Sequence, residues 1–192
     1  MPQPGRPTTE EELRAVTVGE LRRLDGPVTL AAPDPEWPAR FDREAARIRR
    51  ALGDGALLVE HVGSTAVPGL VAKPSIDIAL AVADSADEAA YLPALEAAGF
   101  TLRIREPEWE QHRMLNGADP AVNLHVFTIG SPQVERMLAF RDRLRADARD
   151  RDRYAAEKRR LAAREWHYMQ NYADAKGAVV EEITAEALRR AI

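Results

Sequence analysis

A glycine-serine-threonine loop, followed by a lysine and an aspartate, is the part of this sequence that could bind a phosphate group. In the segment EHVGSTAVPGLVAKPSIDI, the residues Gly63, Ser64 and Thr65 directly follow a predicted strand. Glycine lets a ligand approach the backbone closely, and the serine hydroxyl and nearby N–H groups can donate to phosphate oxygens. Asp77 lies on the next predicted strand, where its carboxylate could hold Mg²⁺, and Lys73 adds a positive charge. Because such turns also occur without any ligand, the short motif alone leaves both interpretations open.

Two histidines and an arginine in later predicted strands are further candidates for ligand binding. His112 and Arg113 are adjacent, and His125 lies on the same strand face as Asn123 and Phe127. His125 could bind the ligand or a metal ion, and the alternative is a hydrogen bond within the sheet. The chain has no cysteine and no histidine pair at zinc-ligand spacing, so nothing in the sequence indicates a zinc site.

A basic helical segment, residues 141–164, holds ten Lys and Arg against five Asp and Glu. Arg141 could clamp a phosphate group with its planar guanidinium. Two Tyr-x-x-x-Lys pairs, which end at Lys158 and Lys176, each place a ring that could stack on a base next to an ammonium group. For most of the segment we favour the alternative, a solvated helix with Arg–Asp pairs.

The composition is that of one globular domain with no membrane-spanning segment. The 192 residues are 45% hydrophobic and 30% charged, with a formal net charge of -4. A net negative charge argues against nucleic acid and anionic membranes as partners. The absence of cysteine, of a long apolar run and of a secretory signal predicts a cytoplasmic protein.

The elements that must position these residues are those of an α+β fold: a small mixed β-sheet covered by helices on one side, with a helical C-terminal segment. Residues 1–27 are predicted to be an N-terminal arm, partly disordered or helical, that docks on the body or on a partner protein. Residues 28–192 are predicted to form a single domain. Hydrophobic periodicity predicts strands over 28–30, 57–62, 75–82, 100–105, 111–115 and 121–129, and helices from 34, over 86–98, and from 132 onward.

The central segment resembles the signature of the GrpB family, a branch of the nucleotidyltransferase (polymerase-β-like) superfamily. The resemblance rests on HVGSTAVPGL and KPSIDI, and on further pieces in the same order: DPEW, HR, NLHV and FRDRLR. It spans about residues 28–190. It implies a nucleotidyltransferase fold that binds a nucleotide or another phosphate-bearing metabolite, with Ser64 and Asp77 as the catalytic residues. It also points to Arg141, Lys158 and Lys176 as ligand-binding residues.

The sequence departs from that superfamily at the implied Mg²⁺ site. The superfamily has a second carboxylate two residues after the first and a third on another strand, because two Mg²⁺ ions need several carboxylates. Here Ala79 stands at the second position, and His125, with Asp77, is the remaining candidate metal ligand. The function therefore stays open between an enzyme that transfers a nucleotidyl or phosphoryl group, a degenerate module that binds a nucleotide or CoA-like metabolite, and an interaction protein that uses its N-terminal arm.

Overall fold

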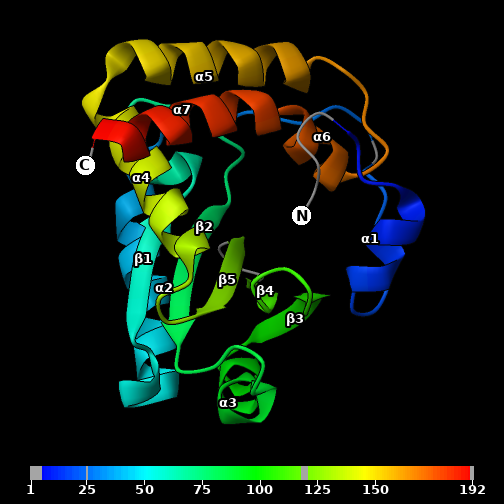
Figure 1. Ribbon diagram of the computed structural model, residues 1–192, viewed down its shortest axis with the longest axis vertical. Helices are drawn as coiled ribbons and strands as arrows, with labels where there is room; N and C mark the ends of the chain where they lie inside the picture. The colour runs from blue at the N-terminus through cyan, green and yellow to red at the C-terminus, as the bar shows by residue number, and fades with distance from the viewer. Residues whose placement is uncertain (1–5, 25, 118–120, 191–192) are drawn as a thin grey trace.

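The protein is described by a computed structural model that covers residues 6–24, 26–117 and 121–190, and it has an α+β fold with one five-stranded sheet (Figure 1). The strand order is β1-β2-β5-β4-β3. The β2–β5 pair is parallel and the other three pairs are antiparallel, so the sheet is mixed, as predicted. The strands are β1 (Leu58–Val62), β2 (Ile76–Val82), β3 (Phe100–Glu106), β4 (His112–Gly117) and β5 (Val122–Thr128).

One face of the sheet holds the main hydrophobic core. Side chains alternate along a strand, so Ile78 and Leu80 of β2 lie on the same face, and both are fully buried. They pack against α2 (Trp37–Leu52), which contributes Ile48, and against α3 (Leu92–Ala97). This layer fixes the register of β2 and therefore the face on which Asp77 lies.

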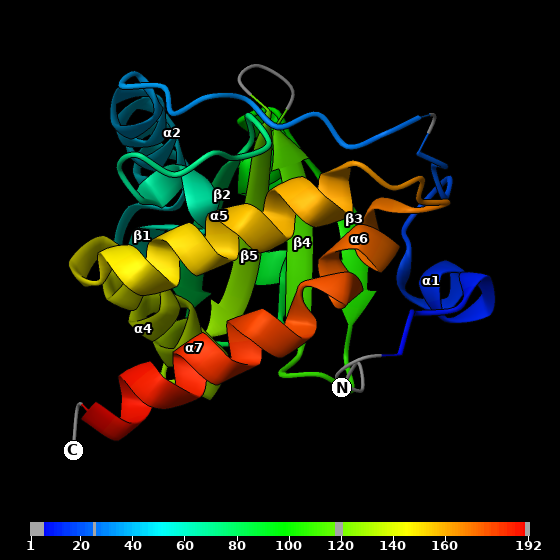
Figure 2. The ribbon, with the colours of Figure 1, turned by 90° about the horizontal axis from the view of Figure 1, so that it is seen from above.

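Helices also cover the opposite face, so the expectation of helices on one side only is wrong. Ala79 and Ala81 of β2 lie on this second face and are buried. Small side chains leave room for helices to approach the sheet closely, which the alternation pattern alone does not reveal. The helix α4 contacts β1 and β2 on this face, and Figure 2 shows α5 and α7 passing in front of the strands when seen from above. The helices are α4 (Pro132–Ala146), α5 (Ala148–Ala162), α6 (Met169–Ala175) and α7 (Gly177–Arg190).

Local sequence signals set the start of the helices that reach the site. The Ser131 side chain caps α4 by accepting a hydrogen bond from the N–H of Gln133, and Pro132 occupies the first turn. The Asp147 side chain caps α5 in the same way. These caps orient α5, which carries Lys158 toward the sheet.

The N-terminal arm lies against the domain. Its helix α1 (Glu10–Val16) begins with a capping box formed by Thr9 and Glu12. After the helix, the N–H of Val18 donates to the carbonyl of Arg103 in β3 at 2.8 Å. The arm therefore docks on the body, one of the two predicted arrangements. Disorder was also predicted for residues 1–9, but Thr8 and Thr9 are ordered by hydrogen bonds to Asp174 and Glu12, and the first five residues lie outside the described residues.

Two further features differ from or limit the sequence predictions. The strand predicted over residues 28–30 does not form. The residues on either side of it make only isolated bridges, Pro27 with Glu165 and Ala31 with Ala72. Among the described residues, no helix has both the length and the apolar character needed to cross a membrane.

Candidate functional site

The glycine loop brings Ser64 and Asp77 together at one end of the sheet. Val62, the last residue of β1, pairs with Asp77 of β2. Gly63 follows with φ +70°, and a Cβ at this position would collide with the Asp77 carboxylate. The short helical turn Ser64–Ala66 begins at the next residue, and Ser64 lines the same cavity as Asp77. A glycine is therefore required here by both backbone conformation and space.

Ser64 and Asp77 both line a cavity of about 850 Å³ between the sheet, the N-terminal arm and α6. This volume falls within the range of small-molecule sites. Of the predicted site residues, the cavity is lined by Gly63, Ser64, Lys73, Asp77, His112, His125 and Lys176. The structure thus brings most of the predicted candidates into one space.

Lys158 supports the cavity from behind Ser64. Its ammonium group donates to Ser64 Oγ at 2.9 Å and also to the carbonyl of Val71. It lies over the ring of Tyr154, 4.7 Å from the centroid. The residue is only 2% exposed, and burial, followed by the nearby charge of Lys176, lowers its pKa to about 7. Lys158 is therefore poised to gain a proton when a negative group arrives.

Two more lysines share this end of the cavity. Lys73 and Lys176 both line it, and the Lys176 ammonium lies 4.5 Å from the centroid of the Tyr172 ring. Burial lowers the pKa of both lysines, and Asp77 opposes that shift. Three ammonium groups thus surround one carboxylate. We call Ser64, Lys73, Asp77, Lys158 and Lys176 the lysine end of the cavity.

Asp77 is held in place by a chain of amides. The side-chain N–H of Asn123 donates to its carboxylate at 2.7 Å, and Asn123 in turn accepts from Asn116 at 2.9 Å. Burial raises the pKa of Asp77, against the opposing effects of this hydrogen bond and of the three lysines. The amide chain leaves the carboxylate facing the lysines rather than a second acidic group.

The donor set at the lysine end does not fit Mg²⁺. Mg²⁺ prefers several oxygen ligands, yet Asp77 is surrounded by ammonium groups and Ala79 occupies the place of a second carboxylate. Within the described residues, no group of three or more His, Asp or Glu side chains could hold a metal ion. His125, predicted as the other ligand, has its Nδ1 engaged by His112. Asp77 and His125 therefore do not form the predicted Mg²⁺ site.

The other end of the cavity contains the two predicted histidines and one residue that the sequence analysis did not identify. His112 Nε2 lies 3.1 Å from His125 Nδ1, and His112 Nδ1 lies 2.7 Å from the carboxylate of Glu106. Glu106 contacts His112 across the β3–β4 pair. Finding it would have required the strand register, which no local signal in the sequence provides. We call Glu106, His112 and His125 the histidine end.

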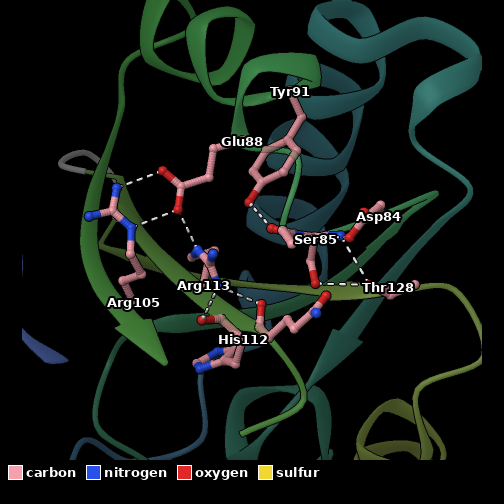
Figure 3. A network of polar contacts seen from close by, with 10 residues as sticks. Asp84, Ser85, Glu88, Tyr91, Arg105, His112, Arg113 and Thr128 are labelled. Carbon is pink, nitrogen blue, oxygen red and sulfur yellow. Dashed lines mark hydrogen bonds and ion pairs between the residues drawn. The ribbon is translucent and has the colours of Figure 1, made fainter. Parts of the chain in front are cut away.

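Arg113 lies on the far side of the sheet from the cavity. Its side chain pairs with Glu88, which also binds Arg105, and it donates to the carbonyl of Gln111 at 2.8 Å (Figure 3). Successive strand residues point to opposite faces, so His112 and Arg113 cannot both face the cavity. The structure therefore does not bring this predicted residue to the site.

Thr65 and Arg141 are also absent from the cavity lining, as is Lys158, which reaches the site by donating to Ser64. The Thr65 hydroxyl is buried, where it donates to the carbonyl of Ser75 and contacts His61 Nε2. Arg141 pairs with Glu60 and Asp142 and donates to a backbone carbonyl. Both residues support the loop and the strand beneath it.

The arm supplies a wall of the cavity that the sequence analysis did not predict. Residues from Arg6 to Arg22 line it, including Glu12, Leu13 and Glu20. The arm is anchored near α6, where the N–H of Thr8 donates to Asp174 at 2.7 Å. Its prediction as a protein-binding element stays a prediction.

Solved structures identify the class of fold. The crystal structure of the conserved protein GrpB from Enterococcus faecalis matches with a TM-score of 0.75 and 29% identity, covering 84% of this chain and 98% of that chain. A structure of the Cid1 poly(U) polymerase matches with a TM-score of 0.50 and 12% identity, covering 76% of this chain and 49% of that chain. The second likeness shows the fold alone. This protein therefore has a nucleotidyltransferase-like fold, as the resemblance implied.

The family follows from sequence relatives. Residues 27–186 match the family described as GrpB protein. The UPF0157 protein BH1888 of Halalkalibacterium halodurans is 59% identical, with 94% of this chain and 93% of that protein covered. The chain therefore belongs to the GrpB family, as the motif resemblance predicted. A dephospho-CoA kinase of Mycolicibacterium paratuberculosis is 35% identical over 86% of this chain but only 46% of that protein, so this chain corresponds to part of it.

Proposed function

We propose that this protein binds a phosphate-bearing metabolite at the lysine end of the cavity, with a nucleotide as the favoured class. The observation that carries the proposal is the convergence of three buried or half-buried ammonium groups and one serine hydroxyl on a site with a single carboxylate. Uncompensated buried charge is unfavourable, so an anionic ligand would stabilise this cluster.

Each group has a distinct part in binding. Ser64 Oγ accepts the hydrogen bond from Lys158, and its hydroxyl, which also interacts with the Tyr154 side chain, can donate to a phosphate oxygen. Lys73 and Lys176 supply charge from the cavity wall, while Lys158 supplies it from behind the serine. Charge-assisted hydrogen bonds of this kind are stronger than neutral ones.

A nucleotide fits the remaining space and the fold. The cavity volume of about 850 Å³ exceeds what a phosphate group alone requires. Tyr168, Trp109 and Met114 line other parts of it and offer flat or adaptable apolar contacts for a base. The nucleotidyltransferase-like fold supports the same class by analogy only.

A CoA-type metabolite is the second candidate. The observation that favours it is the similarity of this chain to about half of a protein named dephospho-CoA kinase. Such a ligand also carries phosphate groups, so the lysine end would bind it in the same way. A binding module without turnover and a group-transfer enzyme both remain compatible with this site.

The test is a thermal-shift and calorimetric panel of pyrophosphate, ATP and CoA, each measured with EDTA and with Mg²⁺. We expect at least one probe to raise the melting temperature, since a ligand that binds the native state stabilises it. Ser64→Ala should weaken that binding, whereas Ser131→Ala, which removes a helix cap away from the lysine end, should not. Binding in EDTA supports lysine-based recognition, and binding only with Mg²⁺ supports a metal carried by the ligand. No stabilisation by any probe at saturating concentration would refute the proposal.

A further inference from the structure

The histidine end of the cavity contains a chain of three titratable side chains that phosphate binding does not use. Glu106, His112 and His125 come from the adjacent strands β3, β4 and β5. The carboxylate of Glu106 lies 2.7 Å from His112 Nδ1, and His112 Nε2 lies 3.1 Å from His125 Nδ1. All three residues line the cavity. These contacts use both ring nitrogens of His112 and Nδ1 of His125, so His125 Nε2 lies at the end of the hydrogen-bonded series.

The two imidazole rings are aligned for proton transfer. Their centroids are 5.3 Å apart with an interplanar angle of 17°, and the nitrogen contact of 3.1 Å places them edge to edge. Phe127 stacks on His112 at 4.7 Å, and Trp109 meets it edge-on at 5.2 Å. The aromatic contacts hold the central ring in this orientation.

The backbone before His112 is held in an uncommon conformation. Glu110 and Gln111 both have positive φ, 51° and 49°, which non-glycine residues rarely adopt. Arg113 donates to the carbonyls of Gln111 and His112 from the opposite side of the strand, and Figure 3 shows Arg113 between His112 and Glu88. Such conformations persist where the surroundings enforce them, and they cluster at functional sites.

Hydrogen-bond chemistry then allows only two arrangements of the protons shared by Glu106, His112 and His125. An ionised carboxylate only accepts, so Glu106 fixes the proton on Nδ1 of His112. While His112 is neutral, its Nε2 accepts from Nδ1–H of His125, and His125 Nε2 is a bare acceptor. Once His112 is positively charged, its Nε2 donates to His125, and His125 Nε2 carries a proton instead.

We propose that Glu106, His112 and His125 form a proton relay that takes the proton from a hydroxyl group of a second ligand in the cavity. This rests on the proposed function, because the phosphate at the lysine end is the group under attack. The hydroxyl oxygen forms a bond to phosphorus, and the bond to the leaving phosphate oxygen breaks with its electron pair. The hydroxyl proton passes to His125 Nε2, and the Nδ1 proton of His125 passes to His112 Nε2.

A relay is needed because a positive charge on the buried His125 ring would be unfavourable. Burial, followed by the neighbouring His112, lowers the pKa of His125 to about 3. Through the relay the positive charge rests on His112, next to the carboxylate of Glu106. His112 and His125 act at different points: His125 would touch the second ligand, whereas His112 and Glu106 are positioning residues.

The strand register places the relay at a useful distance from the phosphate site. Asp77 pairs with Asn123 of β5, and His125 is two residues further along that strand. The separation is thus about one strand spacing of 4.8 Å across and about 6.6 Å along the strand. A hydroxyl group bound between the two ends would lie between phosphorus and His125 Nε2.

The test is ¹⁵N NMR of the histidine rings of the ligand-free full chain between pH 5 and 9. We expect His112 and His125 both to carry their proton on Nδ1 while both rings are neutral, which leaves His125 Nε2 as a bare acceptor. An Nε2 proton on His125 in that state, or a mixture of its two tautomers, would overturn the relay. The other charged residues that line the cavity are Arg6, Glu12, Glu20, Arg22, Lys73, Asp77, Arg103 and Lys176.

Glu106→Gln provides the second arm, with Glu108→Gln, an exposed residue of the same turn, as matched control. Loss of the carboxylate should release the Nδ1 tautomer of His112, because a glutamine amide can donate as well as accept. The control should keep that tautomer, and an unchanged His112 tautomer in Glu106→Gln would overturn the proposal. Glu106→Gln should bind pyrophosphate within about threefold of the unmodified protein. If pyrophosphate binds neither form, the proposed function fails, while the NMR of the ligand-free chain still decides the relay.

Discussion

Burial leaves the titratable groups at the two ends of the cavity in different protonation states. At the lysine end, burial lowers the pKa of Lys158 only to about 7, so the proton is easily regained. At the histidine end, burial lowers the pKa of His125 to about 3, so that ring stays neutral. One end is therefore suited to an anion and the other to a neutral hydroxyl group, although both line the same space.

The means of positioning also differ between the two ends. The lysine end combines a loop that follows β1 with α5 and the end of α6, so it depends on the packing of helices onto the sheet. The histidine end lies on three neighbouring strands and is held by strand register and aromatic contacts. Substitutions should therefore separate the two ends, and four predictions make that comparison sharper.

Gly63→Ala should have the largest effect, with loss of measurable pyrophosphate binding. The added Cβ would collide with the Asp77 carboxylate, and φ is +70°. We also expect the free energy of unfolding to fall by more than about 1 kcal/mol, measured by urea denaturation. Gly69→Ala is the matched control, because Gly69 has a similar φ of +78° but open space around it. Equal effects of both variants on binding would contradict the steric account.

Lys158→Met should weaken pyrophosphate binding by about 10–100-fold. The loss of a charge-assisted hydrogen bond is worth about 1.5–3 kcal/mol. Arg160→Met is the control, since Arg160 is on the same helix but is exposed and pairs with Glu157. Calorimetry that finds both variants equally weakened would show that general charge, rather than the lysine end, determines the affinity.

The affinity for pyrophosphate should fall as pH rises above about 7. Below this pH Lys158 is charged in the free protein, whereas above it the free protein must take up a proton to bind, which reduces affinity by up to about tenfold per pH unit. The affinity ratio of the unmodified protein to Lys158→Arg removes the ligand's own titration, because arginine stays charged. A ratio that stays constant from pH 6 to 9 would argue against a titrating Lys158.

Arg141→Gln should have the smallest effect on binding, with pyrophosphate affinity within about twofold. Arg141 is buried but lies outside the cavity lining and pairs with Glu60 and Asp142. Its substitution should instead lower the free energy of unfolding by about 1–3 kcal/mol. Arg153→Gln, which removes an exposed ion pair with Glu182, should have little effect on stability. A strong loss of affinity in Arg141→Gln would extend the site beyond the cavity.

The lysine end was the more predictable part of the site. Gly63, Ser64 and Asp77 could be found because a tight turn after a strand and a polar residue within an apolar strand are local signals. Lys158 and Lys176 were predicted from their Tyr-x-x-x-Lys pairs and from the family resemblance. Their contacts depend on how α5 and α6 pack onto the sheet, which the i, i+4 spacing of each Tyr–Lys pair does not specify.

The histidine end shows where sequence reasoning stops. The period of two along a strand separates His112 from Arg113, and it could have removed Arg113 from the candidates. Glu106 and the cavity wall formed by the arm could not be found in this way, because both depend on pairing between distant segments. Likewise, buried Ala79 and Ala81 gave no local indication that helices cover both faces of the sheet.

The most direct measurement is a crystal structure of the protein with pyrophosphate, grown at a pH below 7 where Lys158 is charged. The account predicts pyrophosphate in the cavity, with oxygens within hydrogen-bond distance of Ser64 Oγ and of the ammonium group of Lys176, and with Lys158 still donating to Ser64. Pyrophosphate bound elsewhere, or a protein saturated in solution whose lysine end holds no pyrophosphate in the crystal, would contradict it.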